Sequence, residues 1–277
     1  MKMRCATRHY AADRRSARIR KNYPEANIGL QLGRTFSAAQ SKEEGMSDPS
    51  APRVVVTPCH GVVVNPALAR EEAAWIGIFP GESELLVEHV RLATKLAVAL
   101  SAYWVPTGGA TRIGTTLSEA ESAVNLARAE GWLGESGPRT IIENHARDSL
   151  GNLALASAEV RRNTGQYPCE MTVVGYRFKR HRFEAHARDL GFTCRFHYIG
   201  VNDPRADILP DSLMGEYLKS RDLREDPLLR GSKWRAQRNA RNPYAQVLPD
   251  YAAVDPVLGA FLEYVFEGGP PAPPPNW

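Results

Sequence analysis

The sequence lacks the features that mark several protein classes. Its four cysteines (Cys5, Cys59, Cys169, Cys194) form no C-x-x-C pair, which argues against a zinc site or redox motif and favours a reducing compartment. No run approaches the roughly 18 apolar residues that span a bilayer, so no integral membrane segment is predicted. The glycine fingerprints of dinucleotide and P-loop sites and the G-x-S-x-G elbow of serine hydrolases are also missing.

Positive charge is concentrated near the start of the chain. Residues 1–44 contain 10 Lys and Arg against 4 Asp and Glu, whereas the remainder contains 25 against 27. The remainder lacks the basic docking face of nucleic-acid-binding domains, so no nucleic-acid partner is expected. The Arg-rich arm, residues 1–45, is typical of an organellar transit peptide; a disordered arm, or translated sequence upstream of Met46, are the alternatives. Without a transit peptide, a cytoplasmic location is predicted.

Short β-branched or alternating runs are interleaved with helical periodicity over residues 53–201. Strands are predicted at 53–57, 100–105, 140–142, 171–175 and 194–201, and helices at 82–99, 118–132, 148–162 and 179–190. This order predicts βαβ units and therefore a Rossmann-like three-layer α/β/α fold with a mostly parallel sheet of about five strands.

The rest of the chain predicts an appendage to that fold. Helical patterns at 211–222 and 255–266 indicate a C-terminal helical cap. The predicted organisation is an arm (1–45), an α/β domain (46–204), a C-terminal extension packed on the same domain (205–267) and an extended, disordered Pro-rich tail (268–277).

Candidate ligand-binding or catalytic residues follow each of the first four predicted strands, at the end of the sheet where parallel sheets bind ligands. They are His60 after the first strand, Gly108, Gly109, Ser118 and Glu119 after the second, Glu143, Asp148, Ser149 and Asn152 after the third, and Lys179 and Arg182 after the fourth. No spacing among them demands a metal.

Each candidate also has a structural explanation. His60, Glu119 and Glu143 are candidate acid–base groups, but a bonded structural histidine and a carboxylate at a helix start are ordinary features. The amides at Gly108 and Gly109 predict either an anion site or a tight turn.

The remaining candidates are ligand-binding residues with similar alternatives. Ser118 and Glu121 form a capping box, and Asp148 or Ser149 caps the next helix, which leaves Asn152 unexplained. Lys179 and Arg182 are predicted to turn inward from a basic cluster and hold an anion, the alternative being a solvated helix face.

Five of these blocks, in register, resemble the YdcF/SanA/ElyC-type domain of unknown function. They are T-G-G at 107–109, S-E-A at 118–120, Glu143, D-S-x-x-N at 148–152 and F-K-x-x-R at 178–182. The eukaryotic (fungal and algal-like) branch is more similar still, at Trp75, A-R-D-S-x-x-N from 146, F-K-x-x-R-F from 178, G-V-N-D-P from 200 and R-N-P from 241.

The resemblance implies a Rossmann-like fold with a polar cleft at the carboxyl ends of the strands. It also implies S-adenosylmethionine as a possible ligand, because one relative is described as binding it. Thr107, Asp148, Ser149, Gly151 and Lys179 depart from the family pattern, and Lys179 replaces a bacterial histidine. The ligand is therefore left open.

Together these observations predict a YdcF-like enzyme, a hydrolase or transferase, acting on a small anionic molecule that contains phosphate or a nucleotide. The alternative is a non-catalytic module that binds a nucleotide or S-adenosylmethionine. The oligomeric state is not predicted.

Overall fold

Four parallel strands form the central sheet of the protein. A computed structural model describes residues 51–277; the predicted arm lies outside the described residues. The strands are β1 (Arg53–Pro58), β4 (Tyr103–Thr107), β5 (Glu170–Gly175) and β6 (Arg195–Gly200), in the order β4-β1-β5-β6. Val54, Val55 and Val56 are all buried, as expected for strands covered on both faces.

The predicted strand at 140–142 does not form, so the sheet has four strands rather than five. Two isolated parallel bridges, Trp104–Thr140 and Thr107–Glu143, join this segment to the edge of β4. The carboxylate of Glu143 accepts hydrogen bonds from the amides two and three residues farther on. Backbone hydrogen bonds such as Ile141 N to Trp104 O hold the segment alongside β4, and the chain turns away from β4 after Glu143.

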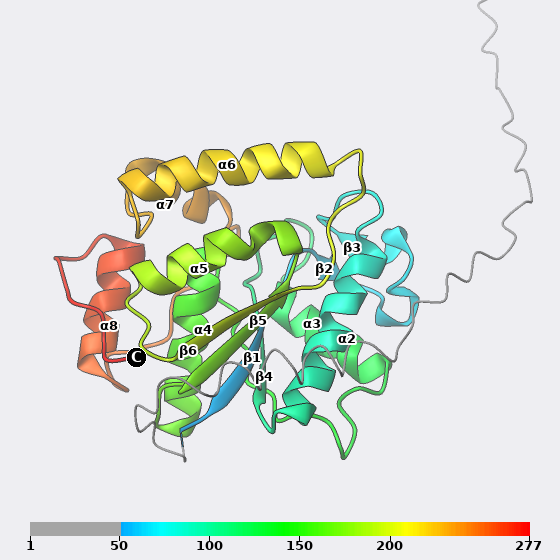
Figure 1. Ribbon diagram of the computed structural model, residues 1–277, viewed down its shortest axis with the longest axis horizontal. Helices are drawn as coiled ribbons and strands as arrows, with labels where there is room; N and C mark the ends of the chain where they lie inside the picture. Colours follow the sequence, from blue (N-terminus) through cyan, green and yellow to red (C-terminus); the bar gives the residue numbers. More distant parts are fainter. Residues whose placement is uncertain (1–50) are drawn as a thin grey trace, which may run out of the picture. The chain divides into compact units, whose positions relative to one another are not determined.

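Helices cover both faces of the sheet, which confirms the predicted three-layer α/β architecture. The helices α2 (Ser83–Ala99) and α3 (Glu119–Ala129) contact each other and β4, whereas α4 (Ser149–Thr164) and α5 (Arg180–Asp189) contact each other on the opposite side (Figure 1). The predicted capping box is present at the start of α3, and Gly165, in a left-handed conformation, ends α4.

The middle of α4 is buried all round, from Leu150 to Val160. One side packs on β1 and β4. The other side is covered by the C-terminal elements α8 (Pro256–Leu262) and η5 (Glu263–Glu267), whose apolar residues belong to the same core. The buried Glu159 pairs with Arg162 at 2.7 Å and also accepts from the Tyr251 hydroxyl at 2.8 Å, so its carboxylate is satisfied beneath this covering.

The Pro-rich tail is packed, contrary to the prediction of disorder. The side chain of Trp277 is buried, and its Nε1 donates to the carbonyl of Leu190 at 2.7 Å. Its ring contacts those of Phe192 and Phe261 edge-on. The prediction was based on the proline content of the tail and did not consider that the Trp277 side chain could anchor it.

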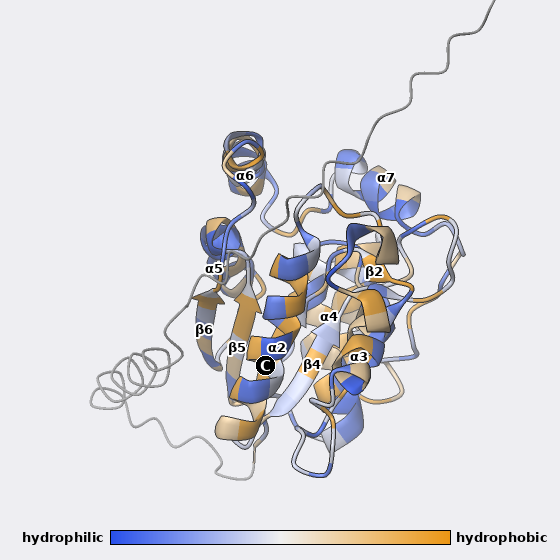
Figure 2. Ribbon diagram, turned by 90° about the vertical axis from the view of Figure 1, so that its right-hand side faces the viewer, coloured by the Kyte–Doolittle hydropathy of each residue, from blue (hydrophilic) through white to orange (hydrophobic). Residues whose placement is uncertain are grey.

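Two helices lie over the α/β layers at one end. The helix α6 (Leu209–Glu225) confirms the predicted helical pattern, while α7 (Ser232–Ala240) was not predicted. In Figure 1, α6 runs across the top above α5, and Figure 2 shows it nearly end-on in the same position. No helix among residues 51–277 is long and apolar enough to cross a membrane.

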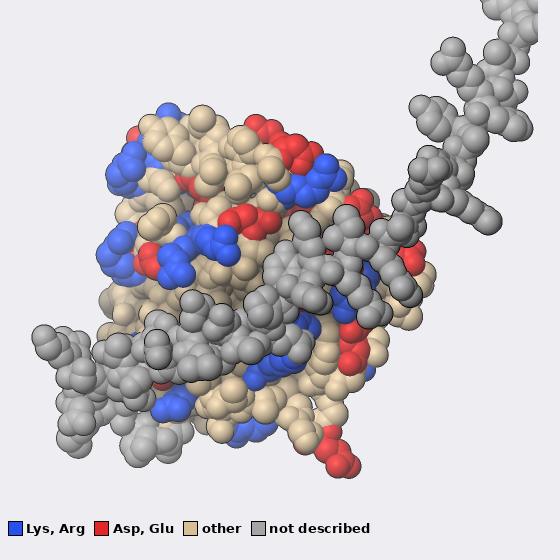
Figure 3. All heavy atoms as spheres, turned by 45° about the vertical axis from the view of Figure 1, so that its right-hand side comes forward, with Lys and Arg blue, Asp and Glu red and all other residues tan. Residues whose placement is uncertain are grey.

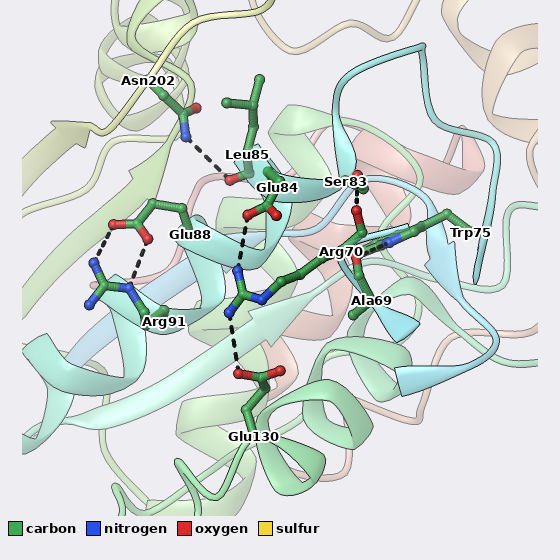
Figure 4. A network of polar contacts seen from close by, with 10 residues as sticks. All are labelled: Ala69, Arg70, Trp75, Ser83, Glu84, Leu85, Glu88, Arg91, Glu130 and Asn202. Carbon is green, nitrogen blue, oxygen red and sulfur yellow. Dashed lines mark hydrogen bonds and ion pairs between the residues drawn. The ribbon is translucent and has the colours of Figure 1, made fainter. Parts of the chain in front are cut away.

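The connection from β1 to α2 holds a two-stranded antiparallel sheet, β2 (Val62–Val63) with β3 (Trp75–Ile76), beside short 3₁₀ turns at Pro66–Leu68 and Glu72–Ala74. Arg70 fastens it by pairing with Glu84 at 3.0 Å and Glu130 at 3.4 Å (Figure 4). The Ser83 hydroxyl donates to the carbonyl of Arg70. This network holds the segment that carries His60 to the end of the sheet.

Candidate functional site

A cleft of about 680 Å³ lies at the carboxyl ends of β1 and β5. Strand order reverses between these two strands, the usual ligand position in open α/β sheets. The residues of α6 and α7 cover the cleft. Seven of the eleven predicted site residues line it: His60, Glu119, Asp148, Ser149, Asn152, Lys179 and Arg182.

The other four predicted residues do not line this cleft. Gly108 and Gly109 donate their amides to the carbonyls of Glu143 and Ala146 at 3.0 and 2.7 Å, so these amides are not free for an anion. A Cβ on Gly108, whose φ is 146°, would lie 3.0 Å from Glu119 Oε2. Glycine here therefore lets the Glu119 side chain pass close to the backbone. Ser118 is buried and occupied by its capping box.

Glu143 is fully buried beneath the cleft floor instead of facing a ligand. One carboxylate oxygen accepts two backbone amides, and the other lies 2.5 Å from the hydroxyl of Thr107, which is 3.1 Å from Asn152 Oδ1. Burial raises the pKa of Glu143 to about 7, against the lowering effect of those hydrogen bonds. A protonated Glu143 completes the chain, because it donates to Thr107 and frees that hydroxyl to donate to Asn152.

Replacing Glu143 by Gln should therefore change how stability depends on pH. Because the folded-state pKa lies above the ordinary value of 4.5, the wild type loses stability as pH rises from about 4.5 to about 7. Glu143→Gln mimics the protonated acid, so it should remove this slope and gain roughly 3 kcal/mol over the wild type above pH 7. Urea unfolding across this range measures the difference. Parallel curves for the two proteins would assign the slope to another group.

Seven Lys and Arg residues and six Asp and Glu residues line the cleft. Because the two numbers are nearly equal, the ion pairs within the cleft determine which cations are free to bind a ligand. Arg182 pairs with Glu216 of α6 at 3.2 Å, and Lys219 lies 3.6 Å from the same carboxylate. Within the described part of the chain, Lys179 has no ion-pair partner. Burial, followed by Arg182, lowers the pKa of Lys179 to about 7.

Arg182 has unused hydrogen-bonding capacity. Its side chain is 8% exposed, and its Nε is buried without a hydrogen-bond partner among the described residues. Such a group is costly unless something else accepts its proton. Arg182 and Lys179 together therefore present donors that a bound anion can satisfy.

A second set of polar groups surrounds His60 at the other side of the cleft. Its Nε2 lies 3.5 Å from Glu82 and its Nδ1 lies 3.4 Å from an amino group of Arg112. Tyr176 donates to the other oxygen of Glu82 at 2.9 Å. Although burial opposes it, the contacts with His60 lower the pKa of Glu82 and keep it ionised.

These contacts define the state of the imidazole. Because arginine only donates, Nδ1 faces Arg112 as an acceptor and Nε2 carries the proton toward Glu82. Glu119 lies beside this group, accepting from the Thr111 hydroxyl at 2.5 Å and pairing with Arg112 at 3.3 Å. The arrangement is a histidine with a carboxylate at Nε2 and an arginine at Nδ1.

Asp148 lines the cleft but both of its oxygens are occupied. One accepts from the amide of Gly151 and the other from Nε of Arg238 at 2.6 Å. Burial would raise the pKa of Asp148, but Arg238 and the Gly151 amide lower it overall. Asp148 therefore connects α7 to α4. Its oxygens are not free to contact a ligand, so neighbouring residues of the cleft would make those contacts.

Sequence reasoning missed Glu82, Glu216 and Lys219. Glu82 precedes α2 and follows no strand, so the strand-end rule passes over it. Glu216 and Lys219 share with Ser212 and Leu223 the face of α6 that lines the cleft. The helical spacing of these residues can be seen in the sequence, but it does not indicate which face of the helix is turned toward the sheet.

On the face drawn in Figure 3, basic and acidic side chains of the described residues are interspersed. Within residues 51–277 no group of His, Cys, Asp or Glu is arranged to hold a metal ion. In comparisons with known proteins, the chain matches no family model, no curated protein and no solved structure.

Proposed function

We propose that the protein is an enzyme that acts on a small phosphate-bearing molecule bound in this cleft. The observation that carries the proposal is the pair of inward-facing cations, Lys179 without an ion-pair partner in the described chain and Arg182 with a buried unpartnered Nε. A phosphate group accepts hydrogen bonds from both and supplies the negative charge that Lys179 lacks.

The groups around His60 supply acid–base chemistry for the same ligand. Glu82 both contacts His60 and acts electrostatically on Lys179, so the two sets of residues face one cleft. When Arg112 moves to the ligand, Nδ1 of His60 is free to take a proton from a water or a substrate hydroxyl. The ionised Glu82 then stabilises the imidazolium while the activated oxygen attacks the phosphorus. The bond from phosphorus to the leaving oxygen breaks, and the imidazolium returns its proton to that oxygen, which completes a hydrolysis or a transfer.

A second candidate function is a binding module without turnover for a nucleotide or S-adenosylmethionine. It is favoured by Phe79, an aromatic side chain that lines the cleft while 54% exposed. Its ring lies 6.1 Å from that of His60, with an interplanar angle of 25°. A flat base stacked on Phe79 would cover this exposed ring.

The test combines calorimetric binding with a phosphate-release assay. The full chain is titrated with pyrophosphate, ribose 5-phosphate, ADP and S-adenosylmethionine, with ribose as the uncharged control. We expect the phosphate compounds to bind and one of them to react. His60→Gln should keep binding but lower turnover by about a hundredfold.

The outcomes separate the two candidates. Binding of ADP or S-adenosylmethionine without reaction, unchanged in His60→Gln, would reject the enzyme and support the module. Failure of every phosphate compound to bind would reject the phosphate site itself.

A further inference from the structure

Helix α6 exposes an apolar stripe on its outer face. Leu213, Met214, Tyr217 and Leu218 are 49%, 58%, 64% and 43% exposed. Their spacing places all four on one side of the helix. They are four of the twelve large apolar side chains exposed in the described chain, gathered within six consecutive residues.

The orientation of α6 keeps this stripe in solvent. Its opposite face lines the cleft, where Glu216 pairs with both Arg182 and Lys219. Rolling the helix to bury the stripe would break the ion pair between Arg182 of α5 and Glu216 of α6. Figures 1 and 2 show α6 as the outermost element above α5, with its outer face uncovered by any described element.

Residues of opposite charge flank the stripe at its two ends. Asp211, at the rim of the cleft that it lines, lies one turn before Met214, and Arg221 lies one turn after Leu218; both are exposed. Consider a second copy of the helix that runs antiparallel to the first and is related to it by a two-fold axis at the level of residue 216 along the helix. This arrangement would place Met214 against Leu218 of the copy. The same register would place Asp211 against Arg221 of the copy, and each contact would occur twice.

From this self-complementarity we infer that the outer face of α6 is a homodimer interface. The partner is a second copy of this chain, paired antiparallel through Leu213, Met214, Tyr217 and Leu218. One helix face is smaller than a standard interface of about 800 Å² per partner, so the dimer is weak and concentration-dependent. A membrane surface fits less well, because Asp211 and Glu225 are exposed on this helix with the stripe.

Sedimentation velocity of the full chain over a series of concentrations tests the inference. The wild type should form a reversible dimer, and Tyr217→Glu should be monomeric. Val98→Glu, which places the same charge at an exposed apolar site on α2, should dimerise normally. Circular dichroism checks that each variant keeps its helices.

An exchange of charge between the two paired residues tests the register in which the two helices meet. Asp211→Arg and Arg221→Asp alone should each weaken dimerisation by about tenfold, and the double variant should restore it to within about threefold of the wild type. A wild type that stays monomeric throughout, or a dimer that Tyr217→Glu leaves intact, would overturn the interface. So would monomeric protein that binds lipid vesicles through this face, shown by loss of flotation in Tyr217→Glu.

Discussion

Lys179→Met should weaken binding of phosphate compounds and stabilise the protein at the same time. Loss of the ammonium removes a cation that has no ion-pair partner among the described residues, so affinity should fall by about a hundredfold. Because burial holds the pKa of Lys179 near 7, well below its ordinary 10.5, the empty protein is destabilised by the charged form. Methionine keeps the packing against Tyr176 and Phe178, whose rings lie 5.1 and 5.6 Å from the ammonium.

The size of this stability effect depends on pH. The unfolded chain binds more protons than the folded one between about pH 7 and 10.5, so wild-type stability rises across this window. The gain of Lys179→Met, several kcal/mol at or below pH 7, should therefore shrink as pH approaches 10.5. Urea unfolding at several pH values measures it, and Lys95→Met, at an exposed position on α2, is the control. A destabilised Lys179→Met protein would contradict the account.

Arg238→Met should have the largest destabilising effect of the substitutions considered. The Asp148 and Arg238 side chains are only 9% and 5% exposed, and Arg238 also donates to the carbonyls of Leu229 and Val265. Its removal leaves a buried carboxylate without its cation and two carbonyls without a donor. Breaking such a pair typically costs about 3–5 kcal/mol, measured here by urea unfolding.

A second variant separates charge from packing. Asp148→Ser keeps a helix-capping side chain before α4 but removes the carboxylate. Combined with Arg238→Met, it should recover about half of the lost stability, because no uncompensated charge stays buried. A double variant no more stable than Arg238→Met would show that packing, rather than the buried charge, accounts for the loss.

Local patterns predicted the parts of the fold that depend on local interactions. The capping box at Ser118 and Glu121 formed, and the β-branched run at Val54–Val56 became a central strand. Lys179 and Arg182 were predicted to turn inward because they follow a strand and share a helix face, and both line the cleft.

Two of the failures come from contacts between distant parts of the sequence, and a third comes from local bonds of one carboxylate. The anchoring of Trp277 depends on Phe192 and Phe261, which the sequence does not place beside it. Helix α7 is highly polar, and its only buried side chains are Trp234 and Arg238. Glu143 was predicted to face a ligand, but its own bonds to nearby amides turned it into the core.

A crystal structure of the protein soaked with ADP tests the central claim most directly. The account predicts a phosphate group within hydrogen-bonding distance of Nζ of Lys179 and Nε of Arg182, with Arg112 drawn away from His60. Phosphate bound elsewhere, or a cleft without ligand at saturating ADP while calorimetry records binding, would contradict it.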